Sequence, residues 1–583
     1  MPLALEWLDH CVKSHPECRL SNPTGWIPTR LLDVENAIFC LRHRSQLLKA
    51  APYATLSHRW RSPPCLILTT DRLAEFEKGI PVEQLSSVFL DAIDVTRRAS
   101  IRYLWIDSLC ILQDSKDDWA HESALMGEVY KHGHFNIAAT ADAEGGDGLF
   151  ADRRSCMTRP GHVATNWTSI VNTQYIWTSP EQAWTPPSAS EDVIQSRGWI
   201  LQESYLSPRT IHFAQWQLQW ECRHGFTAEA WPFRYPDLVV GPYLPRAVES
   251  VKIQLSCDPA TSEIHFKWMS LVLRYMTCRL TRETDRLIAF SAIAREFAMV
   301  MDDIYVAGLW RSELITHLDW YVHERDRDFT RPIDYTAPSW SWASIGTKIQ
   351  FPERYTTGTP NEVVALVQLV EASVDPELDE FGALRAGQLV VRGLLGQATT
   401  VMATKSPDST DHTQDSWIGL RESNFDLTPP PAISEGLERY STGFSSVVNF
   451  DTINSSRVDQ VVLLLPTLLI KSYGDAKILG ILLQEVERQP SKYERTGRFQ
   501  LSVSLQDDRE LDIDYDFDNM SDDSFDGRNL YPDDPNYDTT KFWMSDLLWR
   551  TFADASRSLF QVDPRANDYE LNSLEDFPTV CII

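Results

Sequence analysis

Short apolar runs alternate with amphipathic segments between residues 53 and 140. The run at 103–111 is apolar almost throughout, and those at 53–60 and 134–140 have the length and apolar content of short buried strands, which is typical of strands buried on both faces. Residues 81–99 and 117–131 lie between them and carry apolar side chains at helical spacing. Strands that alternate with helices predict an α/β domain whose parallel sheet is covered on both faces.

The pattern changes on either side of this region. Residues 265–280, 284–301 and 309–322 have the apolar spacing of helices. After residue 346, turn residues separate a series of short apolar runs, which predicts a β-rich domain. We therefore expect four parts: a helical arm at 1–50, an α/β core domain at 51–230, a helical region at 231–360 and a β-rich domain at 361–583.

The chain is strongly acidic. Its 583 residues include 54 Lys and Arg against 82 Asp and Glu, a net charge of −28. Residues 507–538 hold thirteen of these acidic side chains and two arginines, which predicts a solvated insertion. Because such a surface repels phosphate backbones, nucleic acid is not an expected partner.

The sequence predicts a cytoplasmic protein. The N-terminus lacks the basic stretch of a signal peptide. The longest apolar stretch, at 461–470, is too short to cross a bilayer, so no membrane span is expected.

Cysteine and histidine gather near the N-terminus, at His10, Cys11, His15 and Cys18. Thiolates and imidazoles at such separations can bind zinc. The spacing matches no standard zinc finger, however, and Pro16 interrupts the helix that would present the ligands. We favour a packed helix end with reduced thiols, and expect neither a metal site nor a required cofactor.

A group of carboxylates follows the second apolar run. It consists of Asp107, Asp114, Asp117, Asp118 and Glu122. Asp107 interrupts the run, which is costly unless the carboxylate is hydrogen-bonded or lies at a functional site. Glu122 is either half-buried with a raised pKa or paired with Arg59 or Arg61, and such a salt bridge would be purely structural. We expect one of the two adjacent aspartates to cap the following helix.

Residues 196–222 interleave polar and aromatic side chains. The polar ones are Arg197, Gln202, Glu203, Arg209 and His212, and the aromatic ones are Trp199, Tyr205, Trp216 and Trp220. Such a mixture can line a ligand pocket or form a buried ion network at a domain seam, and we favour the network.

Four segments resemble the ordered blocks of the fungal heterokaryon-incompatibility (HET) domain. They are "YATLSHRW", "FLDAIDVTRRASIRYLWIDSLCILQDSKDDWAHESALMGEVY", "NIAATADAEGGDGLFADR" and "RGWILQESYLSPRTIHF", although Arg61 stands where the family has glycine. "DRLIAFSAIA", "YVAGLW" and "APSWSWAS" resemble segments that follow this domain. The resemblance implies a fungal intracellular protein of nonself recognition and regulated cell death. Because the HET core is similar to Toll/interleukin-1 receptor (TIR) domains, it also implies a TIR-like or flavodoxin-like parallel sheet.

Some TIR domains cleave NAD with a glutamate that follows a tryptophan near the start of a helix. Trp119 and Glu122 fall in the matching place, with a spacing one residue shorter. The resemblance therefore implies NAD as a substrate and Glu122 and Asp107 as catalytic residues, because a carboxylate stabilises an oxocarbenium-like ribose. The expected ligand-binding residues are Ser57, Arg59, Trp60, Asp114, Trp119, Arg197, Trp199, Gln202 and Glu203.

Two other function classes fit the same sequence. The chain can be a non-enzymatic module of cell death that self-assembles, with "APSWSWAS" in an interface or seam. HET-like proteins also occur beside fungal natural-product genes. The twenty tryptophans suit a cavity that folds a polyene or terpenoid for a cofactor-free, Diels–Alder type cyclisation. The expected partner is accordingly a small-molecule ligand or a second copy of the chain.

Overall fold

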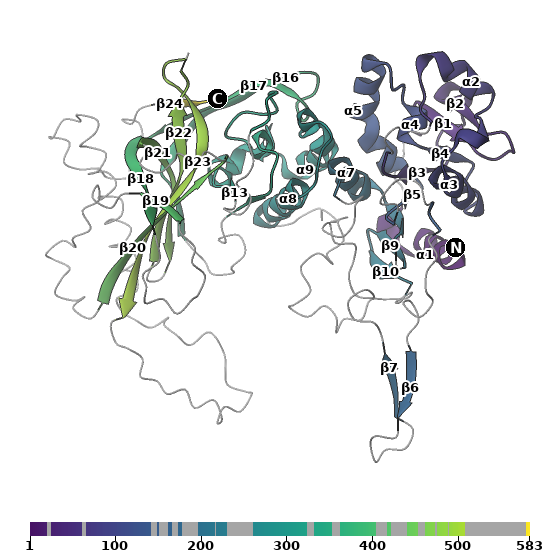
Figure 1. Cartoon of the computed structure of the whole chain (residues 1–583), viewed down its shortest axis with the longest axis horizontal. Coiled ribbons are helices and arrows are strands. Elements are labelled where there is room, and N and C mark those ends of the chain that lie inside the picture. Colours follow the sequence, from purple (N-terminus) through teal and green to yellow (C-terminus); the bar gives the residue numbers. More distant parts are fainter. Residues whose placement is uncertain are drawn as a thin grey trace. The chain divides into compact units, whose positions relative to one another are not determined.

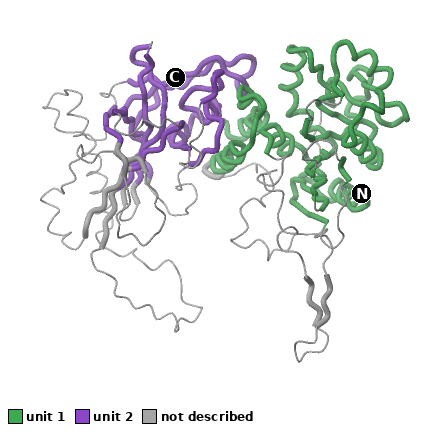
Figure 2. The backbone as a smooth tube through the Cα atoms, viewed as in Figure 1, with its two compact units in different colours: residues 1–302 green, residues 303–583 purple. Residues whose placement is uncertain are grey.

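A computed structural model gives the fold of the chain (Figure 1). It describes residues 1–19, 25–60, 66–141, 148–150, 161–165, 173–177, 196–215, 217–229, 261–322, 331–351, 362–403, 417–420, 440–452, 461–472, 475–487, 489–507 and 579–583. Arg61 and the acidic residues 508–538 lie outside these ranges. The chain divides into two compact units, Met1–Asp302 and Asp303–Ile583 (Figure 2). Within the described ranges, no helix combines the length and the apolar content needed to cross a membrane.

An eight-stranded sheet forms the centre of the first unit. Its strands are β1 (Arg30–Asp33), β2 (Cys40–His43), β3 (Tyr53–Ser57), β4 (Tyr103–Trp105), β5 (Phe135–Ala138), β8 (Arg209–Phe213), β9 (Leu218–Cys222) and β10 (Gly225–Ala228). The spatial order is β10-β9-β8-β5-β3-β4-β1-β2. The four central strands are parallel, and the outer strands are antiparallel. Of the four parallel strands, β3 comes first in the chain and lies between β4, the second, and β5, the third. This is the start of the doubly wound order 2-1-3-4-5.

Helices connect the parallel strands. They are α2 (Leu73–Lys78) and α3 (Ser87–Arg98) before β4, α5 (Lys116–His132) before β5 and α7 (Gly198–Leu206) before β8. The strands β3, β4 and β5 are buried at every position, because both faces of the parallel sheet are covered. The predicted parallel sheet core with helices is confirmed, while its similarity to TIR domains stays a prediction.

Two local predictions change in this unit. The strand expected over 103–111 is wrong beyond Trp105, because Asp107–Cys110 form the short helix α4. An apolar run cannot by itself distinguish a strand from a buried helical turn. The N-terminal segment contains the expected helix, α1 (Pro2–Ser14), and also the strands β1 and β2.

The helices α8 (Thr261–Met276) and α9 (Ser291–Met301) complete the first unit. The Lys131 ammonium of α5 pairs with the Glu296 carboxylate of α9 at 2.5 Å. At Gly127 the two helices approach so closely that a Cβ atom would lie 2.3 Å from the Cβ of Ala292. This contact requires glycine, and it fixes α9 against the helix that precedes β5. The hairpin of β6 (Gly161–Thr165) and β7 (Thr173–Trp177) pairs antiparallel.

The second unit is rich in β structure, as predicted. Its ten-stranded sheet contains β15 (Glu362–Ala365), β16 (Val367–Pro376), β17 (Leu384–Gly393), β18 (Gly396–Ala403), β19 (Trp417–Leu420), β20 (Tyr440–Phe450), β21 (Val461–Ser472), β22 (Asp475–Glu485), β23 (Lys492–Asp507) and β24 (Thr579–Ile582). The pairing closes a ring, β21-β18-β19-β20-β23-β22. Two short pairs precede this sheet: β11 (Tyr305–Val306) with β12 (Leu309–Trp310), and β13 (Tyr321–Val322) with β14 (Ile349–Gln350).

The helix predicted over 309–322 is wrong. Within residues 309–322, the only α-helix is the short α10 (Leu314–His317), and it lies between the strands β12 and β13. The apolar side chains that suggested a helix instead fill the core of the second unit, where Trp310 and Trp320 are fully buried. Trp340 and Trp342 of "APSWSWAS" are fully buried as well. The segment is therefore part of this unit's core, and its tryptophans are not exposed at an interface.

Candidate functional site

The carboxyl ends of β3 and β5 mark the topological switch point of the parallel sheet. The neighbours of β3 are β4 on one side and β5 on the other, so the connections that follow β3 and β4 run to opposite sides of β3. In doubly wound sheets, ligands bind in the crevice outside the strands at such a point. We call the polar residues gathered here the strand-end cluster: Ser57, His58, Trp60, Asp107, Asn136, Arg197 and Glu203.

The floor of the strand-end cluster is a set of buried hydrogen bonds. The Ser57 hydroxyl donates to the carboxyl group of Glu203 and accepts from the amide N–H of Asn136 at 3.0 Å. The Thr55 hydroxyl donates to the Asn136 side-chain oxygen at 2.9 Å. All four side chains are buried. Helix α7 is thereby tied through Glu203 to both strands of the switch point.

Glu203 is a buried carboxyl group with a high affinity for a proton. Burial raises its pKa to about 7, and the negative charge of Asp107 contributes to the rise. The hydrogen bonds from Ser57 and Tyr130 and the charge of Arg197 act in the opposite direction. Glu203 therefore gains or loses its proton near neutral pH, and groups with such shifted pKa values concentrate at functional sites.

Asp107 is the accessible carboxylate of the strand-end cluster. Its side chain is 25% exposed. The indole N–H of Trp60 donates to one carboxylate oxygen at 2.7 Å, and the backbone N–H of Ser108 donates to the other at 2.7 Å. The Nδ1 atom of His58 lies 3.8 Å from Asp107, and Arg197 donates to the His58 carbonyl oxygen at 2.6 Å. Two donors thus orient a carboxylate that a ligand can still reach.

The stability of the first unit is expected to depend on pH through Glu203. The pKa of this group is about 4.5 in the unfolded chain and about 7 in the folded chain. Because the folded chain binds the proton more tightly, its stability falls as the pH rises between these two values. The full loss is about 3 kcal/mol. Thermal unfolding at about pH 5 and about pH 8 should therefore show a smaller pH dependence in Glu203→Gln than in the wild type; equal dependence in both would contradict the assignment.

Glu122, the predicted catalytic glutamate, lies beside β1. Its side chain is 2% exposed, and this burial raises its pKa. A hydrogen bond from Thr29 and the charge of Arg30 lower the pKa in part, and the Oε1 atom has no hydrogen-bond partner. The neighbouring base is thus Arg30 and not Arg59. Within the described residues, no hydrogen bond or ion pair connects Glu122 to the strand-end cluster.

The remaining carboxylates near α5 hold local structure together. Asp118 pairs with the guanidinium group of Arg30 at 2.6 Å. Asp114 accepts the backbone N–H of Thr70 at 2.9 Å and its hydroxyl at 3.0 Å, which fixes the turn before α2. The prediction that an aspartate caps α5 is wrong: Ser115 is the N-cap, and its hydroxyl accepts the backbone N–H of Asp118 at 3.3 Å. The aspartates of the first turn instead favour the helix through its dipole.

The other predicted binding residues are distributed around the strand-end cluster. The buried amide oxygen of Gln202 accepts the backbone N–H of Ala292 at 3.0 Å, at the start of α9. Trp199 is half-buried and hydrogen-bonds to Asp285. Trp119 is half-buried on α5, and Arg59 is exposed next to Trp60. Of the predicted site residues, the structure brings together Ser57, Trp60, Asp107, Arg197 and Glu203.

Sequence reasoning missed three residues of this site. His58 lies beside Asp107, Asn136 bridges β3 and β5, and Tyr130 hydrogen-bonds to Glu203. Asn136 carries a usable signal, because an amide inside an apolar strand is costly unless it is hydrogen-bonded. His58 and Tyr130 carry no comparable signal, since both occur in ordinary amphipathic contexts.

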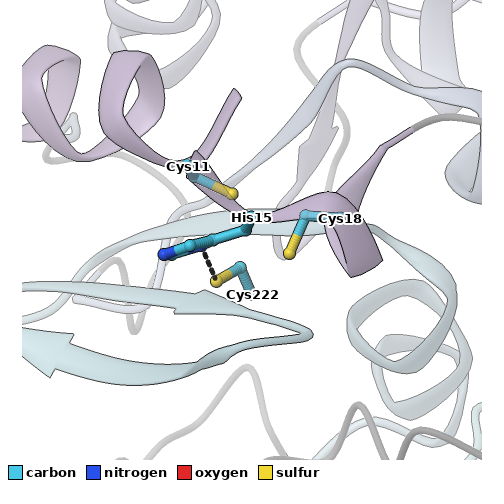
Figure 3. A group of neighbouring side chains, drawn as sticks. All are labelled: Cys11, His15, Cys18 and Cys222. Atoms are coloured by element: carbon cyan, nitrogen blue, oxygen red, sulfur yellow. Dashed lines mark hydrogen bonds between the residues drawn. The ribbon is translucent and has the colours of Figure 1, made fainter. Parts of the chain in front are cut away.

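A second cluster of polar side chains includes Cys222, which pairs with the first residue of β8 and so lies at the opposite end of the parallel strands from the strand-end cluster. Figure 3 shows its members. Cys11 comes from the end of α1, His15 and Cys18 from the turn that follows, and Cys222 from the end of β9. The four potential ligand atoms all lie within 4.8 Å of one another. The sequence pattern contained the first three residues. His10 lies outside the cluster: its ring meets the His15 ring edge-on at 5.2 Å between centroids, and its Nδ1 atom lies 3.4 Å from the Ser14 hydroxyl.

The strand-end cluster and the parallel strands β3, β4 and β5 lie within one recognised domain, and β8 follows it. Residues 53–203 match the family model of the heterokaryon incompatibility protein (HET). This range begins with the first residue of β3 and ends at Glu203, so the chain contains a HET domain. No curated protein and no solved structure matches the chain.

Proposed function

We propose that the HET domain of this chain cleaves the bond between ribose and nicotinamide in NAD, as an effector of regulated cell death. The family match implies a role related to heterokaryon incompatibility. The observation that carries the proposal is the strand-end cluster, in which the reachable carboxylate of Asp107 lies beside a buried Glu203 with a pKa of about 7. Two carboxyl groups in unlike environments at a switch point are suited to glycosidic chemistry.

Asp107 is the group that faces the reacting ribose in this proposal. When the nicotinamide nitrogen leaves with the bonding electron pair, positive charge develops on the ribose, and a fixed carboxylate stabilises it. The N–H groups of Trp60 and Ser108 hold Asp107 in one orientation, so little reorganisation is needed during the reaction. Water then adds to the ribose, and its surplus proton passes to solvent or to a neighbouring base.

Arg197 and Arg59 are the proposed contacts of the diphosphate. One nitrogen of the Arg197 guanidinium group donates to the His58 carbonyl oxygen, and its other N–H groups, which hydrogen-bond to none of the described residues, suit a phosphate. Arg59 is exposed on the same segment as His58 and Trp60. Glu203 is a positioning residue: its carboxyl group holds Ser57, and its titration couples the cluster to pH near neutrality.

The test is an incubation of the purified full-length chain with NAD, followed by quantification of nicotinamide and ADP-ribose. Release of both in equal amounts supports the proposal. The proposal is overturned if the pure chain binds no NAD and releases no nicotinamide over hours. This must hold both at concentrations where the chain is monomeric and at concentrations where it assembles. Light scattering in the same samples reports whether turnover requires self-association.

Glu122 provides a sharp comparison within the same assay. The resemblance to TIR domains implies that Glu122→Gln abolishes turnover. The buried position of Glu122 beside Arg30 instead suits a structural carboxyl group, although its unpartnered oxygen offers one acceptor to a ligand hydroxyl. Because glutamine replaces a buried carboxyl of raised pKa with a neutral isostere, the melting temperature should change little. Turnover in Glu122→Gln thus decides between the two carboxylate assignments.

The cyclase alternative gains no support from the described residues. Six tryptophans, four of them in the second unit, are fully buried in packed interiors, so they do not line an open cavity. The cavity of about 660 Å³ in the second unit has no tryptophan among its described lining residues. Conversion of a polyene or terpenoid by the pure chain, without NAD turnover, would establish that alternative.

A further inference from the structure

Four side chains with metal-binding chemistry converge at one end of the first unit (Figure 3). Cys11, Cys18 and Cys222 are buried, and His15 is half-buried. They come from two places far apart in the chain, the α1 end with its following turn and the last residue of β9. Three thiols and one imidazole are a ligand set typical of structural zinc.

The distances suit a tetrahedral ion. With Zn–S of about 2.3 Å and Zn–N of about 2.0 Å, the nitrogen–sulfur edge of a tetrahedron is roughly 3.5 Å. The Nδ1 atom of His15 lies 3.6 Å from the Sγ atom of Cys222. All ligand atoms lie within 4.8 Å of one another, so shifts of about 1 Å would bring every edge to its coordinated length.

A buried positive charge beside the cluster supplies an independent observation. Arg209 of β8 is 2% exposed, and its Nε–H points at the Cys11 sulfur at 3.3 Å. Its other donors go to the carbonyl oxygens of Cys18 at 2.6 Å and His134 at 3.0 Å. Among the described residues no carboxylate pairs with it, although a buried guanidinium normally requires a counter-charge. A zinc ion with three thiolates and a neutral imidazole carries a net charge of −1, and this charge would be the counter-charge of Arg209.

Ring contacts outside the cluster hold His15 in place. Its ring stacks on His224 at 4.0 Å between centroids, and His224 in turn pairs with Glu17. Such outer contacts fix the orientation of a ligand ring. Pro16, which interrupts α1, also releases His15 and Cys18 from the helix, so that both can turn toward Cys222.

We propose that Cys11, His15, Cys18 and Cys222 bind one structural Zn²⁺ ion. Three thiols lose their protons to solvent when the ion binds, and all four coordination positions are filled by the protein, which leaves none for a substrate. The ion joins the N-terminal helix to β9, whose partner β8 belongs to the parallel sheet. Residues 1–18 thereby become a fixed part of the fold around the HET domain, although they lie outside the matched range.

The test is the metal content of the purified full-length chain, measured by mass spectrometry after removal of loosely bound ions. We expect one zinc per chain, and a melting temperature that a strong chelator lowers by about 5 °C or more and that added Zn²⁺ restores. Cys222→Ser should lose the zinc. The matched control is Cys278→Ser, which changes another buried thiol of the same unit outside the cluster and should keep the zinc.

Two further measurements keep the proposal decidable if Cys222→Ser fails to fold. His15→Ala removes the least buried ligand and should weaken zinc binding by at least about tenfold while the chain still folds. The wild type loaded with Co²⁺ should show the absorption of a tetrahedral site with thiolate ligands. A wild type that takes up no zinc from Zn²⁺ solution, or a disulfide between two of these cysteines in the purified chain, overturns the proposal.

Discussion

Asp107→Asn is expected to lower the rate of NAD cleavage by about 100-fold or more, with little change in KM for NAD. Asparagine keeps the shape of the side chain and can still accept one of the two hydrogen bonds that Asp107 receives from Trp60 and Ser108. It removes only the negative charge that would face the oxocarbenium-like ribose. Because the side chain is partly exposed, the melting temperature should stay close to that of the wild type.

Asp114→Asn is the matched control for this prediction. Asp114 also lies after β4, but its oxygens accept hydrogen bonds from Thr70 in the turn before α2. Turnover should therefore remain within about twofold of the wild type. If Asp107→Asn retains full turnover while Glu122→Gln loses it, the strand-end cluster is not the catalytic centre. Glu122, which the TIR resemblance implies, is then the catalytic carboxylate.

Asp451→Asn is expected to destabilise the second unit by about 3–5 kcal/mol. Asp451 is 1% exposed and accepts hydrogen bonds from the Nε and Nη2 atoms of Arg495 at 3.1 and 3.2 Å. Arg495 is fully buried, with its guanidinium carbon 3.5 Å from the ring centroid of Trp320. Burial lowers the pKa of Arg495, whereas Asp451 raises it. Removing the carboxylate takes away the hydrogen-bonded counter-charge of Arg495 and leaves only the weaker influence of Asp319 among the described acidic groups.

An exposed ion pair of the same unit supplies the control. Asp375 and Arg385 lie 3.2 Å apart with more than half of each side chain exposed. Asp375→Asn should cost less than about 1 kcal/mol, because water and salt screen the pair. The measurement is urea unfolding, followed by a probe in the second unit. Equal costs for the two substitutions would show that the buried pair contributes no more than the surface pair.

Part of the strand-end cluster could be predicted from the sequence. The apolar runs at 53–60 and 134–140 located β3 and β5, and the alternation with helices gave the parallel sheet whose carboxyl ends meet. Asp107 was identifiable because a carboxylate in an apolar run needs a partner. The sequence did not identify that partner, because Trp60 lies 47 residues away from Asp107 along the chain and meets it only in the folded structure.

The burial and the partners of Glu122 and Glu203 could not be predicted from the local sequence. Both occur on helices next to apolar side chains, so the sequence offers no way to rank their burial or their partners. The fold places Glu122 against Arg30 of β1 and Glu203 against Ser57 of β3. The pKa of each carboxyl group follows from these neighbours and from burial, and both are properties of the packed sheet.

The sequence by itself determined the α/β order of the N-terminal region, the β-rich C-terminal region and the resemblance to the HET domain, because these depend on local periodicity and on the order of motifs. Only the tertiary structure decided which polar residues act together. Cys11, His15 and Cys18 form an incomplete ligand set along the chain, and the fourth ligand, Cys222, follows more than two hundred residues later. Strand pairing between β8 and β9 sets its distance from the other three, and no local pattern encodes such long-range pairing.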